Sequence, residues 1–188
     1  MKNLKKVQIG FIGSYGDLPI SKYVRISREI GKEIARAGAV FIGGVEKDAG
    51  LVREAAKAAR KAGGIVVSIP RKKEDARDAD IVIPSYGAIG LREYLLPLAC
   101  DTIIAINGGS GTLNEIAVAY QNNIPVVMIE NSGGWSQKLQ KSFLDKRKKY
   151  KFITAKNPKK AVELAIKLTA SKREKARDRA KEKKDESR

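Results

Sequence analysis

Short runs of apolar residues alternate along the chain with longer segments in which apolar residues recur every three or four positions. The short runs are continuous, which is typical of strands covered on both faces of a sheet. The longer segments have the periodicity of helices that bury one side. Strands and helices that alternate through short connections favour right-handed crossovers and a parallel sheet. The pattern therefore predicts an α/β fold with a Rossmann-like, doubly wound parallel sheet.

The strands are expected wherever an apolar run meets glycine, proline or a charged turn. They span residues 7–12, 39–42, 65–69, 81–83, 102–106, 125–129 and 152–154. Helices are expected over residues 23–37, 51–59, 91–99 and 112–121, followed by a basic helix after Trp135 and a last helix from residue 157 to about 170. We predict one domain over residues 1–170 and a charged tail over residues 171–188 that extends the last helix and frays.

The composition narrows the chemistry that the chain can carry out. With 188 residues the chain is long enough for one well-buried domain. It has no histidine, which excludes Ser-His-Asp and Cys-His nucleophilic sites and histidine-bound zinc, and no metal site is predicted. Its single cysteine, Cys100, lies among apolar residues and is expected to be a buried thiol. No apolar run has the length of a membrane span, so we expect a cytoplasmic protein without a membrane partner.

The formal net charge of +17 raises nucleic acid as a partner, because lysine and arginine neutralise phosphates. Much of the excess lies at residues 146–151 and 172–188, and acidic residues interrupt the second stretch. Such interleaving favours a solvated helical face. Binding of nucleic acid through the basic helix and tail is a third, less favoured interpretation.

Three glycine turns follow predicted strands and would meet at the carboxyl edge of the sheet, where such folds bind ligands. Glycine lets backbone N–H groups approach an anion, and the N-terminus of the next helix adds its positive dipole end. We therefore predict a phosphate site at this edge. Its candidate ligand-binding residues are Gly13, Ser14, Gly43, Gly44, Gly108, Gly109, Ser110, Gly111 and Thr112.

The turn at residues 108–112 carries the strongest signal. The sequence lacks both the dinucleotide pattern G-x-G-x-x-G and the Walker pattern, whereas three glycines at a strand-to-helix junction are uncommon. Thr112 and Glu115 are also spaced as a capping box, in which each side chain bonds the other residue's amide. Glu115 is thus either a functional group or a cap. Arg92 is either an anion clamp or a partner of Glu93.

These residues resemble the LOG superfamily, often labelled "lysine decarboxylase-like". The likeness rests on Gly-Gly-x-Gly-Thr-x-x-Glu at residues 108–115, Gly-Ser at 13–14, and Gly-Gly at 43–44 followed by Gly50-Leu51-Val52. It covers residues 7–170 and is greatest for the molybdenum-cofactor carrier branch, whose members have an arginine placed as Arg92 is. The resemblance implies a Rossmann-like fold and a homo-oligomer, a dimer or a tetramer.

The resemblance implies two functions. Carrier proteins bind a pterin phosphate, the molybdenum cofactor, without turnover. LOG enzymes hydrolyse the N-glycosidic bond of nucleoside 5′-monophosphates, in which case Arg92 and Glu115 would be the catalytic residues. The chain differs from these enzymes at Asn107, where they usually carry proline, and at Glu93, where they carry lysine. We expect binding of a nucleoside monophosphate or pterin phosphate, with hydrolysis as the alternative and no cofactor required. No lysine lies in the glycine turns, so lysine decarboxylation is rejected.

Overall fold

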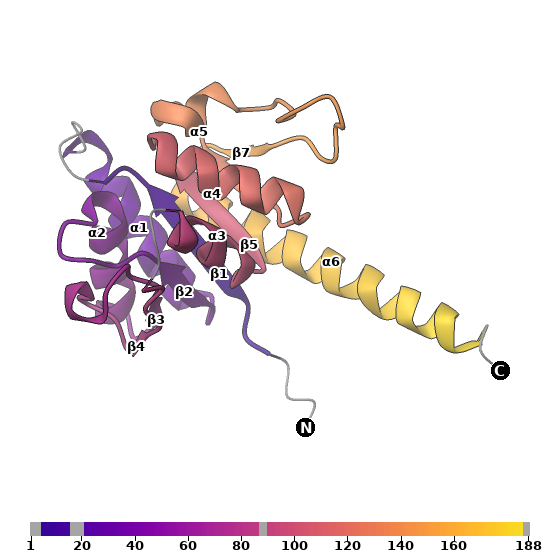
Figure 1. The fold of residues 1–188 in the computed structure, drawn as a ribbon, viewed down its shortest axis with the longest axis horizontal. Helices are drawn as coiled ribbons and strands as arrows, with labels where there is room; N and C mark the ends of the chain where they lie inside the picture. The colour runs from indigo at the N-terminus through magenta and orange to yellow at the C-terminus, as the bar shows by residue number, and fades with distance from the viewer. Residues whose placement is uncertain (1–4, 16–20, 87–89, 186–188) are drawn as a thin grey trace.

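The core of the protein is a seven-stranded parallel sheet with the order β4-β3-β2-β1-β5-β6-β7 (Figure 1). The computed structural model describes residues 5–15, 21–86 and 90–185. The chain winds outward from β1 to β4, returns to pair β5 with β1, and then winds to the other edge, which confirms the doubly wound sheet. The strands are β1 (Gln8–Gly13), β2 (Val40–Gly43), β3 (Ile65–Ser68), β4 (Ile81–Val82), β5 (Thr102–Ile106), β6 (Val126–Ile129) and β7 (Ile153–Ala155).

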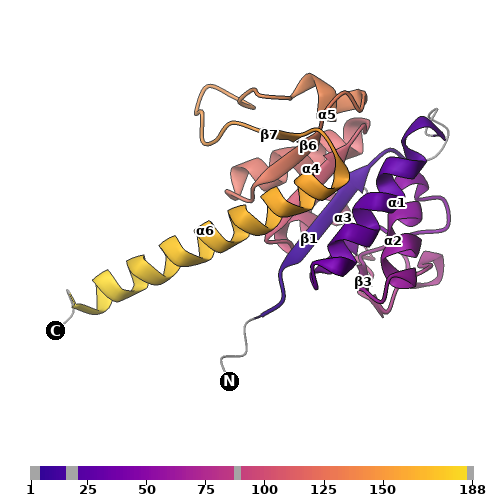
Figure 2. The ribbon, with the colours of Figure 1, turned by 180° about the vertical axis from the view of Figure 1, so that it is seen from behind.

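Helices cover both faces of this sheet. One face carries α1, α2 and α6, and the other carries α3, α4 and the short α5 (Figures 1 and 2). The helices are α1 (Ser21–Arg36), α2 (Gly50–Lys61), α3 (Leu91–Leu98), α4 (Ser110–Gln121), α5 (Gly134–Lys138) and α6 (Pro158–Asp185), with a 3-10 turn η1 at Lys73–Asp75.

Successive residues of each strand enter two separate cores, which explains why the apolar runs are continuous. In β1, Phe11 packs with the residues of α1, α2 and α6, whereas Ile12 packs with those of α3 and α4. In β2, Phe41 and Ile42 divide in the same way. Because side chains alternate across a strand, burial of both faces requires apolar residues at every position.

Close packing of the helices depends on small residues. A Cβ at Gly31 of α1 would lie 2.0 Å from the Ala55 carbonyl oxygen of α2, so glycine lets the two helices touch. A Cβ at Gly10 of β1 would lie 2.6 Å from the Cys100 sulfur. Cys100 is buried, as predicted, and its burial raises the thiol pKa, so the thiol fills space and stays protonated.

In the C-terminal third, one predicted helix is shorter than expected and the last helix is longer. The expected basic helix is shorter than its basic run suggests, because α5 ends at Lys138 and residues 146–151 form a turn followed by an irregular segment. There Asp145 accepts a hydrogen bond from the Arg147 amide, and the run of like charges disfavours a helix. The last helix continues without a break to Asp185, and residues 186–188 lie outside the described part. Among the described residues, no helix is long and apolar enough to cross a membrane.

Candidate functional site

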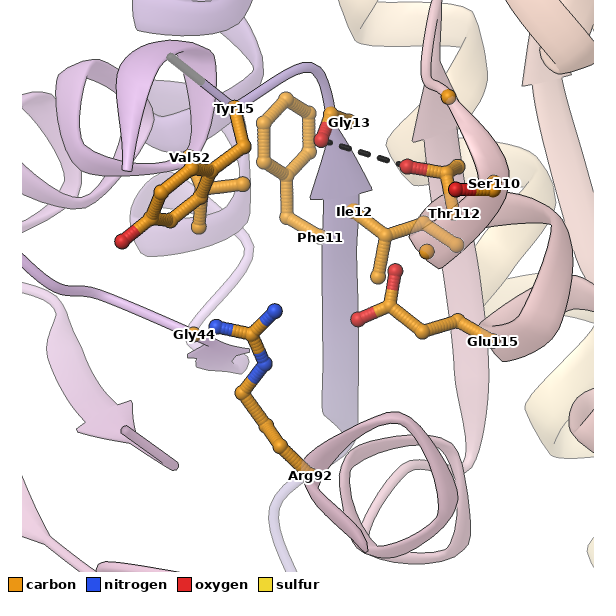
Figure 3. A pocket seen from close by; sticks show the side chains of 12 residues that line it. Phe11, Ile12, Gly13, Tyr15, Gly44, Val52, Arg92, Ser110, Thr112 and Glu115 are labelled. Atoms are coloured by element: carbon orange, nitrogen blue, oxygen red, sulfur yellow. Dashed lines mark hydrogen bonds between the residues drawn. The ribbon is translucent and has the colours of Figure 1, made fainter. Parts of the chain in front are cut away.

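A pocket of about 220 Å³ opens at the carboxyl ends of β1 and β5 (Figure 3). These strands are neighbours in register, with Gly13 beside Ile106, and they mark the point where the winding of the sheet reverses. Ligands of such sheets bind in this position. The pocket is lined by Phe11, Ile12, Gly13, Tyr15, Gly44, Val52, Arg92, Gly109, Ser110, Gly111, Thr112 and Glu115.

The turn between β5 and α4 is built by two residues with left-handed backbones. Asn107 has φ 56° and Gly108 has φ 99°, and the Asn107 side-chain oxygen accepts the Gly108 N–H at 2.7 Å. Proline is confined to φ near −65°, so it does not fit this conformation at position 107. Asn107 therefore fits a left-handed turn that proline could not adopt, and its side chain also stabilises that turn.

Side chains tie this turn to the end of β1. The Ser14 hydroxyl, which is buried, accepts the Gly108 N–H at 3.2 Å, and the Thr112 hydroxyl donates to the Gly13 carbonyl at 3.3 Å. A Cβ at Gly108 would lie 2.4 Å from the Thr112 methyl carbon, so no larger residue fits there. The glycine turns after β1 and β5 thus form one rigid unit.

The N-terminus of α4 presents its backbone to the pocket. The first bond of the helix runs from the Leu113 N–H to the Gly109 carbonyl, so the N–H groups of residues 110–112 have no carbonyl partner within the helix. Gly109, Ser110 and Gly111 are exposed, and a Cβ at Gly109 would meet nothing within 4 Å. Open N–H groups at the positive end of a helix dipole can bind an anion.

The capping-box interpretation of Thr112 and Glu115 is wrong. The helix begins at Ser110, two residues earlier than predicted, and its N-cap residue, Gly109, makes no side-chain cap bond. Thr112 is therefore inside the first turn and bonds Gly13 instead. This leaves the Glu115 side chain in the pocket, pointing toward Arg92 (Figure 3).

Glu115 is a buried carboxyl group with only 8% of its surface exposed. Burial raises its pKa to about 8; the Arg92 charge opposes this rise and the Glu93 charge adds to it. At neutral pH the group is mainly protonated. It then offers an O–H donor to the pocket as well as acceptor oxygens.

Arg92 forms the opposite wall of the pocket, from the first turn of α3. Its Nη1 donates to Glu46 at 3.3 Å and its Nη2 donates to Glu93 at 2.8 Å. The guanidinium carbon also lies 5.7 Å from the centre of the Tyr15 ring. The predicted pairing with Glu93 is therefore present, and it coexists with a position in the pocket. Within the described chain, the buried Nε of Arg92 has no hydrogen-bond partner.

Glu46 is the residue that sequence reasoning missed. Its carboxylate is 1% exposed and accepts hydrogen bonds from Tyr15 at 2.6 Å, from Arg71 at 3.2 Å and from Arg92. Burial raises its pKa, but the Arg71 amide, the Tyr15 hydroxyl and the Arg92 charge outweigh burial, so the net pKa is lowered. An ionised carboxylate thus holds two arginines. A lone glutamate in a loop has no spacing pattern that marks it.

The remaining predicted residues include the glycine pair at the end of β2. Gly44 lines the pocket beside Arg92, and a Cβ at this position would make an ordinary contact with the Arg92 side chain at 3.4 Å. Gly43 packs against Val52 of α2, where a Cβ would lie 2.8 Å from the Val52 side chain. Gly43, Ser14 and Gly108 are not among the lining residues, and their role in ligand binding stays a prediction. Residues 87–89, in the loop before Arg92, lie outside the described residues.

The chain matches a protein family and an archaeal relative. The model of the SLOG cluster4 family matches residues 6–162, which is more than half of the chain. An uncharacterized protein of Archaeoglobus fulgidus is 36% identical over 129 residues, which are 68% of this chain and 82% of that protein.

Two solved structures, of proteins named for binding or carrying the molybdenum cofactor, have a similar fold. The molybdenum cofactor binding protein of the phototrophic bacterium Rippkaea orientalis is 26% identical, with a TM-score of 0.75 over 88% of this chain and 98% of that one. The molybdenum cofactor carrier protein of Chlamydomonas reinhardtii is 25% identical, with a TM-score of 0.76 over 88% and 99%.

Proposed function

This chain belongs to the SLOG cluster4 family, and from that premise we propose that it binds the phosphate-bearing end of a small molecule, a nucleoside monophosphate or a pterin phosphate. One observation carries the proposal. The open N–H groups of α4 and the guanidinium of Arg92 line the same pocket at the reversal point of the sheet. Both kinds of donor suit a phosphate.

In this proposal the backbone is the principal anion donor. Arg92 shares its charge with the carboxylates of Glu46 and Glu93, which fix the guanidinium and weaken its pull on a further anion. The N–H groups of residues 110–112 have no such competitor within the helix. The phosphate would therefore lie against the start of α4, and Arg92 would contact the ligand from the other side.

Binding without turnover is the form of this function that we favour. A protonated Glu115 donates a hydrogen bond to a ligand oxygen, whereas it does not stabilise a developing positive charge as a carboxylate does. The pocket of about 220 Å³ is smaller than the ~300–1,000 Å³ of ligand pockets that enclose a whole drug-sized molecule. It would hold the phosphate and adjoining atoms, with the rest of the ligand outside. The two solved relatives, named for the molybdenum cofactor, support a carrier role.

Hydrolysis of a nucleoside 5′-monophosphate is the second candidate. The observation in its favour is that Glu115 does not cap α4 and faces Arg92 across the pocket. A ligand that brings positive charge close to Glu115 would lower its pKa and ionise it. The carboxylate would then support the oxocarbenium charge on ribose or orient water.

Substitution of Ser110, the first residue of α4, tests the phosphate site. We expect Ser110→Asp to weaken AMP binding at least about tenfold in calorimetry, because its carboxylate repels the phosphate while it suits the positive end of the helix. Ser110→Asn, of nearly the same size but neutral, is the control and should bind within about threefold of the wild type. Equal binding by both variants would contradict the site.

Release of free base separates the carrier from the enzyme. Incubation with AMP, followed by chromatography for adenine, should give no more product with the wild type than with Glu115→Gln if the protein is a carrier. Adenine above that background would instead establish the hydrolase. Fluorescence titration with the molybdenum cofactor, kept free of oxygen, tests the pterin phosphate. The homo-oligomer, a dimer or a tetramer, stays a prediction that light scattering in solution can check.

A further inference from the structure

A second cavity, a groove of about 630 Å³, lies at the end of the sheet opposite the candidate phosphate site. It runs between the amino ends of β6 and β7 and the second half of α6, which projects beyond the sheet (Figures 1 and 2). The residues that line this groove are Asn123, Pro125, Val126, Lys149, Tyr150, Lys151, Ile153, Leu168, Ser171, Lys172, Lys175, Ala176 and Arg179.

The groove collects positive charge from two separate parts of the sequence. Lys172, Lys175 and Arg179 are three and four residues apart, so they share one face of α6. Lys149 and Lys151 line the groove from the segment before β7. No acidic residue is among the lining residues, and all five cations are exposed.

These cations are available to a ligand. Within the described residues, none of the five forms an ion pair. Lys149 donates to the Gln121 carbonyl, but an ammonium group has three donors, so it can serve a second acceptor. Five cations that line one groove with no acidic residue among the lining repel one another, and an anion that binds among them relieves this repulsion. The basic tail of the sequence is therefore one wall of a defined site.

The floor of the groove is apolar and fixed. Val126 is buried, and Leu168 and Ile153 are half-buried beside it. The Tyr150 hydroxyl donates to the Ile124 carbonyl at 2.6 Å, and its ring packs edge-on against Phe152 at 5.6 Å between centres. An occupant thus meets charge along the two sides and an apolar surface between them.

We propose that this groove binds a single strand of nucleic acid through its phosphodiester backbone. Such proteins combine a basic groove that follows the backbone with aromatic side chains on which bases stack, and Tyr150 is an aromatic residue that lines this groove. The three cations of α6 extend over about 10 Å of helix, which is longer than one phosphate group. A polyanion suits this groove, because five cations and no acidic residue line it. The site is independent of the pocket at the start of α4, which lies at the other end of the sheet.

The test is fluorescence anisotropy with a labelled oligothymidylate of about 20 nucleotides. We expect the double variant K175E/R179E to weaken binding at least about tenfold and to reduce the salt slope by about 1.4, since each lost phosphate contact removes about 0.7. The matched control is R177E/K181E, which makes the same change of charge at two exposed positions of α6 outside the groove. The control should retain affinity within about threefold.

Further arms of the experiment distinguish the groove from a general attraction to charge and from a different occupant. Oligouridylate should bind as tightly as oligothymidylate, because phosphates carry the contact. An equal loss in the control variant would overturn the groove and leave only attraction to net charge. Equal affinity for a duplex of the same length would overturn the single-strand assignment.

Displacement of the oligonucleotide by polyglutamate at equal charge would identify an acidic protein as the occupant instead. Displacement by AMP would move the contact to the pocket at α4 and also overturn the proposal.

Discussion

The two walls of the pocket at the start of α4 offer hydrogen-bond donors by different means. One wall is the turn at residues 107–112, where the donors are backbone N–H groups and their position depends on φ angles and on close packing. The other wall is an ion network, in which Glu46 orients Arg92 and Arg71. A wall made of backbone is sensitive to the size of a side chain, and a wall made of ions is sensitive to charge and pH.

The largest effect is expected from Gly108→Ala in the backbone wall. A side chain at φ 99° is strained, and its Cβ would overlap Thr112, so we expect a loss of about 3 kcal/mol in the free energy of unfolding. Gly109→Ala is the control, because its φ of −94° suits alanine and its Cβ meets nothing. It should cost less than about 1 kcal/mol. Denaturant unfolding measures the stability of both variants. Equal losses would contradict the idea that the left-handed turn at Gly108 requires glycine.

In the ionic wall we expect Glu46→Gln to cost about 2 kcal/mol in unfolding experiments. The amide keeps the shape but leaves Arg92 with one carboxylate, while Arg71 can still reach solvent. Glu93→Gln, which removes a single ion pair of the same arginine, is the control and should cost less than about 1 kcal/mol.

The effect of Glu46→Gln should also depend on pH. The pKa of Glu46 is lowered in the folded protein, so its stabilisation is complete above the unfolded pKa of 4.5 and is lost as pH falls through the folded pKa. The stability difference between wild type and variant should therefore be constant above about pH 5 and should shrink in stronger acid. A difference that stays constant down to acid unfolding would contradict the ionised carboxylate.

The most gradual effect is expected from Glu115, which belongs to the backbone wall but has a titratable group, because its contribution to stability changes with pH. Its folded pKa of about 8 lies above the ordinary value of 4.5, which applies to the unfolded chain. Between these values the folded state holds a proton that the unfolded state has lost, so stability falls as pH rises. The slope is at most about 1.4 kcal/mol per pH unit. Glu115→Gln should remove this slope between about pH 5 and about pH 8, and parallel stability curves for both proteins would contradict it.

Much of the fold could be predicted from the sequence, because burial of both strand faces leaves a continuous apolar signature. The predicted runs at β1, β5 and β6 agree with the observed strands within a residue or two. The resemblance to the LOG superfamily and its molybdenum-cofactor carrier branch is also confirmed. The expected basic helix ends early, at Lys138, although residues 146–151 have helix-forming side chains. Local propensity does not report the turn at Asp145 or the repulsion between like charges.

The candidate site could be predicted only where it depends on local sequence. Gly109, Gly111 and Thr112 are recognisable because glycines cluster at a strand-to-helix junction mainly where a backbone must approach a ligand, and all three line the pocket. The network around Glu46 could not be found, since Glu46 and Arg92 are separated by 46 residues and meet only through tertiary packing. The predicted start of α4 is misplaced because Thr112 and Glu115 fit a cap by spacing, whereas the turn places the cap at Gly109.

The bond from the Gly108 amide to the Ser14 hydroxyl has a consequence for folding. It joins residues 94 positions apart, one from each half of the sheet. Contacts that are distant in sequence require a long loop to close, so they form late and slow the folding reaction. A partly folded chain in which only the first half of the sheet is ordered would therefore lack the pocket. Competence to bind a ligand should be acquired in one step, when the two halves of the sheet join at β1 and β5.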